Sequence, residues 1–171
     1  MSVLYRTLVL AAVVVLAVVA QVAVLPVVAV NGVVPNLALL VVVAAALVRG
    51  PEVGVAVGFT AGMLLDLAPP AEHVAGRWAL AFVLAAILAG RVRGDARESP
   101  LAALATVGAC SFVATSVFAL SGQVLGDHAV PVGQMIGVVF LALLWDVVVA
   151  PLVLPVLMRL LERSPARELA V

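Results

Sequence analysis

Lysine is absent from the sequence, and its basic side chains besides two histidines are nine arginines, balanced by nine acidic residues. Charged residues make up only 11% of the 171 residues, whereas 66% are apolar. A soluble domain carries about 25% charged residues. So few polar side chains cannot cover a water-facing surface, which excludes a soluble enzyme, a secreted domain and a disordered region. The zero net charge gives no reason to expect a nucleic-acid partner.

Cysteine and aromatic residues are also scarce. The single cysteine, Cys110, cannot form an intrachain disulfide, and aromatic residues make up only 5% of the chain. The mean hydropathy is +1.34. The apolar residues form long uninterrupted runs instead of alternating with polar ones, which indicates helices and not an outer-membrane barrel. The sequence therefore predicts an all-α integral membrane protein with a single transmembrane domain.

Six apolar segments organise this domain, which we expect to be a compact six-helix bundle. A helix needs about 20 residues to cross the hydrocarbon core. The first, fifth and sixth segments are long enough alone, whereas the second to fourth are short. These short segments draw on flanking residues or span a thinned bilayer, or the second and third form a re-entrant pair. In chain order the segments are 7–30, 35–48, 53–68, 78–90, 101–122 and 132–158.

The arginine positions predict the orientation in the membrane. If all six segments cross, eight arginines lie on one side, and only Arg77 lies on the other. The positive-inside rule then predicts that the N-terminus and the C-terminus are both cytoplasmic and that the protein lies in the inner (cytoplasmic) membrane. The first apolar run is longer than the 7–15 residues of a secretory signal, so we expect no cleavage. The eight are Arg6, Arg49, Arg91, Arg93, Arg97, Arg159, Arg163 and Arg167.

Small residues recur every four positions in the third segment, at Gly54, Gly58 and Gly62, and Asp66 continues the same step. This spacing makes a slanting stripe on one helix face, which lets a neighbouring backbone approach closely. In one interpretation the stripe packs within the chain and Asp66 is satisfied at the membrane surface. In the other, the stripe is a docking groove for a separate transmembrane helix.

Asp146 lies near the middle of the sixth segment. A charge at that depth costs at least about 2.5–3.5 kcal/mol, so we expect an interior, hydrogen-bonded carboxyl group. Pro151 should kink this helix and free the carbonyl of Val147, which with Asp146 could instead bind a cation or a polar partner. Gln21 is a second candidate interior polar residue, and Asn36 could bond N–H groups at the start of the second segment.

Catalytic constellations are not recognisable in the sequence. It shows no Ser-His-Asp or Cys-His set and no phosphate-binding loop, and His73 and His128 have no matching ligands at metal spacing. We therefore expect no enzyme activity, no cofactor and no metal.

Several motifs together resemble the MreD family of rod shape-determining proteins. They are Pro35-Asn36-Leu37, Arg49-Gly50-Pro51 and Gly54-x-x-x-Gly58-Phe59-x-x-Gly62-x-Leu64-Leu65-Asp66, with the Trp145-Asp146 pair in the last segment. Of these residues, Gly58, Gly62 and Asp66 match family positions. The resemblance also implies a bundle similar to the substrate-binding subunits of energy-coupling factor transporters.

The resemblance implies a non-enzymatic inner-membrane component of the bacterial elongation machinery. Its implied partner is the single-span protein MreC. Through MreC it would act on the penicillin-binding transpeptidase and the lipid-linked glycan polymerase, and it would be linked indirectly to MreB filaments.

The alternative function is a substrate-binding membrane subunit of a small-solute, vitamin-type transporter. Such a subunit needs a set of placed polar groups around its ligand. Few polar side chains converge between the expected helices, which favours the scaffold.

Overall fold

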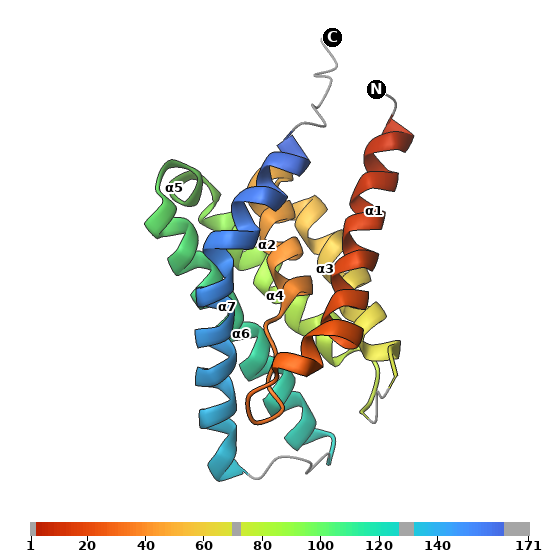
Figure 1. Cartoon of the computed structure of the whole chain (residues 1–171), viewed down its shortest axis with the longest axis vertical. Coiled ribbons are helices and arrows are strands. Elements are labelled where there is room, and N and C mark those ends of the chain that lie inside the picture. The colour runs from red at the N-terminus through yellow and green to blue at the C-terminus, as the bar shows by residue number, and fades with distance from the viewer. Residues whose placement is uncertain (1–2, 70–72, 127–131, 163–171) are drawn as a thin grey trace.

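The computed structural model describes residues 3–69, 73–126 and 132–162, and this part of the chain is helical, with no β-strand among its elements (Figure 1). Three stretches are long and apolar enough to cross a membrane: Leu4–Val28, Pro100–Val124 and Gly133–Glu162. The α-helices are α1 (Val3–Val19), α2 (Leu37–Arg49), α3 (Pro51–Leu67), α4 (Arg77–Arg91), α5 (Arg93–Glu98), α6 (Pro100–Val124) and α7 (Val132–Glu162).

The first apolar segment, expected over 7–30, is not one regular helix. After α1 the chain forms a π-helical turn over Ala20–Val24 and a 3-10 turn over Leu25–Val28, where Pro26 has no N–H to donate. Ala29 is extended, and Val30 and Val33 exchange backbone hydrogen bonds of 3.1 and 2.9 Å around a tight turn. The chain thus reverses before α2 begins.

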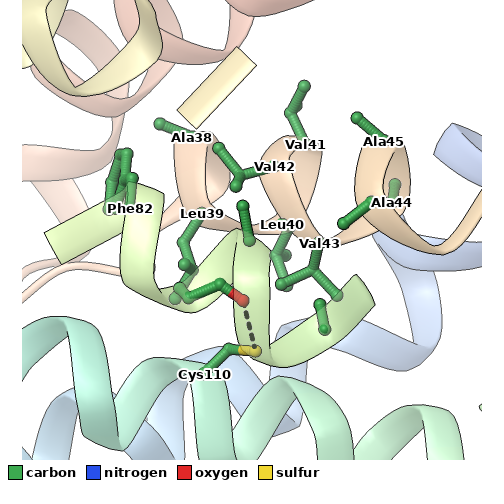
Figure 2. Packing of buried hydrophobic residues seen from close by; sticks show 14 of the residues in the cluster. Ala38, Leu39, Leu40, Val41, Val42, Val43, Ala44, Ala45, Phe82 and Cys110 are labelled. Carbon is green, nitrogen blue, oxygen red and sulfur yellow. Dashed lines mark hydrogen bonds between the residues drawn. The ribbon is translucent and has the colours of Figure 1, made fainter. Parts of the chain in front are cut away.

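Helix α2 is the centre of the bundle. Its residues Ala38 to Leu47 are 0–1% exposed, and the helix contacts each of the other six α-helices (α1, α3, α4, α5, α6 and α7). Figure 2 shows side chains from Ala38 to Ala45 pointing to different sides of the helix, with Phe82 and Cys110 nearby. A helix that is apolar all round is a buried helix. Its 13 residues cover about 20 Å, less than the hydrocarbon thickness of about 30 Å.

A tight turn joins α2 to α3. Gly50 has φ 97° and ψ 168°, a conformation that L side chains rarely adopt, and its N–H bonds the carbonyl of Ala46 at 3.0 Å. Pro51 then occupies the first position of α3, where its missing N–H has no intrahelical partner to lose. The Arg49-Gly50-Pro51 sequence therefore folds two neighbouring helices back on each other.

One described helix falls between the expected segments, and the last segment forms one long helix. The short helix α5, Arg93–Glu98, follows α4 after one residue and has too few apolar side chains to appear as a segment. Helix α7 continues through Pro151 and Pro155, and Figure 1 shows its two halves inclined to each other.

The ends of the bundle differ in charge. The start of α1, the α2–α3 turn, α5 and the end of α7 lie at one end (Figure 1). We call this the arginine end, because these elements and the end of α4 carry Arg6, Arg49, Arg91, Arg93, Arg97 and Arg159. Arg77, at the start of α4, lies at the opposite end. Arg163 and Arg167 lie outside the described residues.

Candidate functional site

Asp146 lies at the buried start of α2. Its side chain comes from α7, and the residue is 1% exposed. One carboxylate oxygen accepts the backbone N–H of Asn36 at 2.6 Å, and the other accepts the hydroxyl of Ser111 on α6 at 2.6 Å. The structure thus places Asp146 in the interior and gives both of its oxygens hydrogen bonds.

Two further side chains complete this arrangement. The Oδ1 atom of Asn36 accepts the N–H of Leu39, and the Oε1 atom of Gln21 accepts the N–H of Ala38, both at 3.0 Å. The first N–H groups of a helix have no intrahelical partner, and negative charge is favoured there. Three side chains from separate parts of the chain therefore satisfy the start of the central helix. We call Gln21, Asn36, Ser111 and Asp146 the α2 cap.

The opposite end of α2 has a positive counterpart. Arg93 donates from Nε to the carbonyl of Leu47 at 2.7 Å and from Nη2 to the carbonyl of Val48 at 3.0 Å. Arg49 donates in the same way to the carbonyl of Leu161, near the end of α7, at 3.1 Å. Carbonyls at a helix end lack partners and favour a cation. The central helix therefore has a carboxylate at its start and a guanidinium at its end.

Asp66 repeats this capping role at the start of α4. It is 2% exposed, and its carboxylate accepts the N–H groups of Gly76, Trp78 and Ala79 at 2.8, 3.1 and 3.2 Å. His73 Nδ1 lies 3.7 Å from the same carboxylate. Asp66 therefore joins the last turn of α3 to the first turn of α4.

Arg77 is a buried anchoring residue whose contacts the sequence does not predict, because the sequence identifies it only as the arginine opposite the other eight. The residue is 5% exposed and donates to the Phe118 carbonyl at 2.8 Å and to the Ser121 hydroxyl at 3.4 Å. Its guanidinium carbon lies 4.1 Å from the centre of the Phe118 ring, and the Trp78 ring stacks on that ring at 4.2 Å. Arg77 therefore anchors α4 to α6. The one sequence feature that could have indicated this anchoring role is an isolated arginine directly before an apolar segment.

The glycine stripe of α3 faces other helices of the same chain. A Cβ atom on Gly54 would lie 2.6 Å from the Cβ of Ala46 in α2. One on Gly58 would lie 2.8 Å from the carbonyl oxygen of Phe82, and one on Gly62 would meet the backbone of Ala79, both in α4. In this structure the glycine face of α3 therefore lies directly against α2 and α4.

The described residues contain no group of three His, Cys, Asp or Glu side chains that could hold a metal ion. His128 lies outside them. Cys110 is buried and donates to the carbonyl of Ala85 at 3.4 Å, as Figure 2 shows. The grooves between helices are mainly apolar; one of about 510 Å³ separates α5 and α6 from α7 beside Pro151 and Pro155.

The capped helices coincide with the motifs singled out in the sequence. Pro35-Asn36-Leu37 stands at the start of α2, Arg49-Gly50-Pro51 forms the α2–α3 turn, and the glycine stripe leads to Asp66. A family model described as rod shape-determining protein MreD matches residues 1–164. Comparison with curated proteins and with solved structures finds no match. With a family match over nearly its whole length, the chain belongs to the MreD family of rod shape-determining proteins.

Proposed function

We propose that the chain is a non-enzymatic scaffold of the cell-wall elongation machinery in the bacterial inner membrane. It binds an MreC-type single-span protein and helps control rod shape and lateral peptidoglycan synthesis. The transpeptidase, the glycan polymerase and MreB filaments are reached indirectly through that partner. The family match over residues 1–164 carries this proposal.

The use of the buried polar side chains supports a scaffold over a solute-binding subunit. Gln21, Asn36, Asp66 and Asp146 each bond to a backbone N–H at a helix start. A solute pocket needs polar groups that are directed at the ligand. In this chain these four polar side chains bond to the helices themselves. We therefore expect the partner protein to bind at the outer surface of the bundle.

The orientation and the architecture belong to the same proposal. The arginine end carries six of the described arginines and the opposite end carries Arg77, which favours cytoplasmic termini. We further propose that residues 1–171 form a single transmembrane domain with six membrane segments. In this domain α2 is shielded from lipid, and the bundle is similar to energy-coupling factor substrate-binding subunits.

Co-purification tests the proposed function. The chain and an affinity-tagged MreC-type protein are co-expressed, extracted in mild detergent and purified on the tag. The control is the same tagged protein with its transmembrane helix replaced by one of unrelated sequence. We expect the chain to be retained by the first protein and not by the control. Equal retention by both, or by neither, contradicts the proposal.

A further inference from the structure

An open groove separates α1 from α3. It has a volume of about 500 Å³ and is lined by Thr7, Leu10 and Ala11 of α1 and by Glu52, Val53, Ala56, Val57 and Thr60 of α3. The buried residues in the described part of α1 are Val14 and Val18, both in its second half. Figure 1 shows α1 leaning away from α3 toward the arginine end. The groove, which we call the α1–α3 groove, therefore opens where the two helices diverge.

Small residues line both walls of the α1–α3 groove. Thr7 and Ala11 are four residues apart on α1, as are Ala56 and Thr60 on α3. Such pairs allow close backbone approach between membrane helices. The Thr60 hydroxyl donates to the carbonyl of Ala56 at 2.8 Å, so its polar group is satisfied within its own helix. The walls are therefore suited to an apolar helix.

The α3 wall is distinct from the glycine stripe. Ala56 and Thr60 lie two positions beyond Gly54 and Gly58, about 200° around the helix at 3.6 residues per turn. The glycine face is filled by α2 and α4, whereas Ala56 and Thr60 are exposed. Helix α3 therefore has a second face with small residues, and no helix in the described part of the chain covers it.

A carboxylate stands at the arginine end of the α1–α3 groove. Glu52 lies in the first turn of α3, where negative charge favours the helix, and it is exposed. Its side chain has no ion pair or hydrogen bond to another described residue. In the proposed orientation this end is cytoplasmic, where a single-span protein carries lysine or arginine beside its transmembrane helix. Arginines surround this end of the bundle, but Glu52 is the charged residue among those that line the groove, so a basic flank seated in the groove meets a carboxylate.

We propose that the α1–α3 groove receives the transmembrane helix of the single-span partner, with a basic residue at that helix's cytoplasmic flank paired to Glu52. This inference rests on the proposed function and adds the binding surface to it. The groove walls supply close packing, and Glu52 sets the depth and direction of the bound helix.

Cysteine cross-linking in membranes tests the surface. Ala56→Cys and Thr60→Cys are paired with single cysteines along the partner's transmembrane helix, and Leu152→Cys on the exposed face of α7 is the matched control. Cys110 is buried and stays in place, so the otherwise unchanged chain measures the background. We expect cross-links to the partner from positions 56 and 60 and none from 152. Cross-links to the partner from 152 alone, or from 56 and 60 only to a second copy of this chain, overturn the inference.

Bulk and charge substitutions provide an independent test. Ala56→Trp should reduce the co-purified partner about tenfold by filling the groove, whereas Leu152→Trp should leave it unchanged. Glu52→Arg should reduce it as well, and an arginine-to-glutamate change in the partner's flank should restore it. Each variant is first required to match the unchanged chain in membrane abundance and thermal midpoint.

These outcomes separate the surface from the function. If the unchanged chain retains the partner and a folded Ala56→Trp variant retains it equally, the groove is the wrong surface and the scaffold function stands. If the unchanged chain does not retain the partner, the proposed function itself fails.

Discussion

The carboxylate of Asp146 accepts the backbone N–H of Asn36, 110 residues earlier in the chain, at 2.6 Å. This bond joins the last long helix to the start of the central one. It places an acidic group where the partial positive charge of α2 is concentrated. A side chain from a distant segment thus caps the start of the most deeply buried helix.

Asp146→Leu should lower the free energy of unfolding by about 2–4 kcal/mol, because the Asn36 N–H and the Ser111 hydroxyl lose their acceptor in an apolar interior. Asp146→Asn should cost less, since an amide oxygen still accepts one of the two bonds. Thermal unfolding in detergent measures both variants, and complementation of rod shape measures their function. A normal midpoint for Asp146→Leu would contradict the capping role. Loss of function with normal abundance in Asp146→Asn would show that the charge itself is needed.

Asp66→Ala should also destabilise the protein, by about 1–2 kcal/mol, because Asp66 accepts three N–H groups at the start of α4. Asp66→Asn should retain part of this stability. Trypsin cleavage after Arg77 provides a local measurement, since Arg77 is 5% exposed and release of the start of α4 should make it accessible. Unchanged cleavage and midpoint in Asp66→Ala would rule out this role.

Gly62→Ala should destabilise the protein more than the same change at an exposed helical glycine. The added methyl group would meet the backbone of Ala79, which cannot rotate away, so α3 and α4 must separate at a cost of about 1–3 kcal/mol. Gly137→Ala in α7 is the matched control, because beyond its own helix backbone and chain neighbours no described atom lies within 4 Å of the added Cβ. Thermal midpoints of the two variants check this difference, and equal midpoints would contradict close packing at Gly62.

Two arginines of the arginine end should respond differently to substitution. Arg93→Met removes two bonds to the carbonyls that end α2 and should cost about 1.5–3 kcal/mol. Arg97→Met removes a surface pair with Glu162, whose side chains are 40% and 44% exposed, and should cost at most about 1 kcal/mol. Chemical unfolding of both variants measures the difference. A larger loss of unfolding free energy for Arg97→Met than for Arg93→Met would contradict the role of Arg93 at the end of α2.

Reporter fusions test the proposed orientation. A reporter fused after Val171 should be active only in its cytoplasmic form, and one inserted within residues 126–131 only in its periplasmic form. The arginine end and the position of Arg77 are the physical reason for this expectation. Activity of either fusion in the opposite format would overturn the orientation.

The burial of Asp146 could be anticipated from its depth in an apolar run, since an uncompensated charge there is costly. Its partners could not, because Asn36 and Ser111 lie 110 and 35 residues away and no local pattern joins them to Asp146. Asn36 was expected to bond N–H groups at a helix start, which is local information. Its Oδ1 atom does so at Leu39.

Helix α2 shows what the apolar pattern conveys and what it leaves out. Its apolar residues predicted a helix but left open whether the short segment spans the membrane. The structure surrounds it with helices on all sides, so its length need not match the bilayer.

The irregular turns after Val19 were not foreseen, because a continuous apolar run conceals a change from α-helical to π-helical and 3-10 geometry. Helix α5 was missed for the opposite reason, since it is short and polar.

The long-range cap of α2 has a consequence for biosynthesis. Asn36 leaves the ribosome 110 residues before Asp146, so α2 is made when the acceptor for its first N–H group does not yet exist. During that interval Gln21 and Asn36 are already present to accept the N–H groups of Ala38 and Leu39. The Asn36 N–H alone depends on water, lipid headgroups or the insertion machinery for its hydrogen bond. Because α2 also packs against α7, its packing is complete only after α7 has been synthesised. A chain that ends before Asp146 should remain an incompletely assembled target for membrane quality-control proteases.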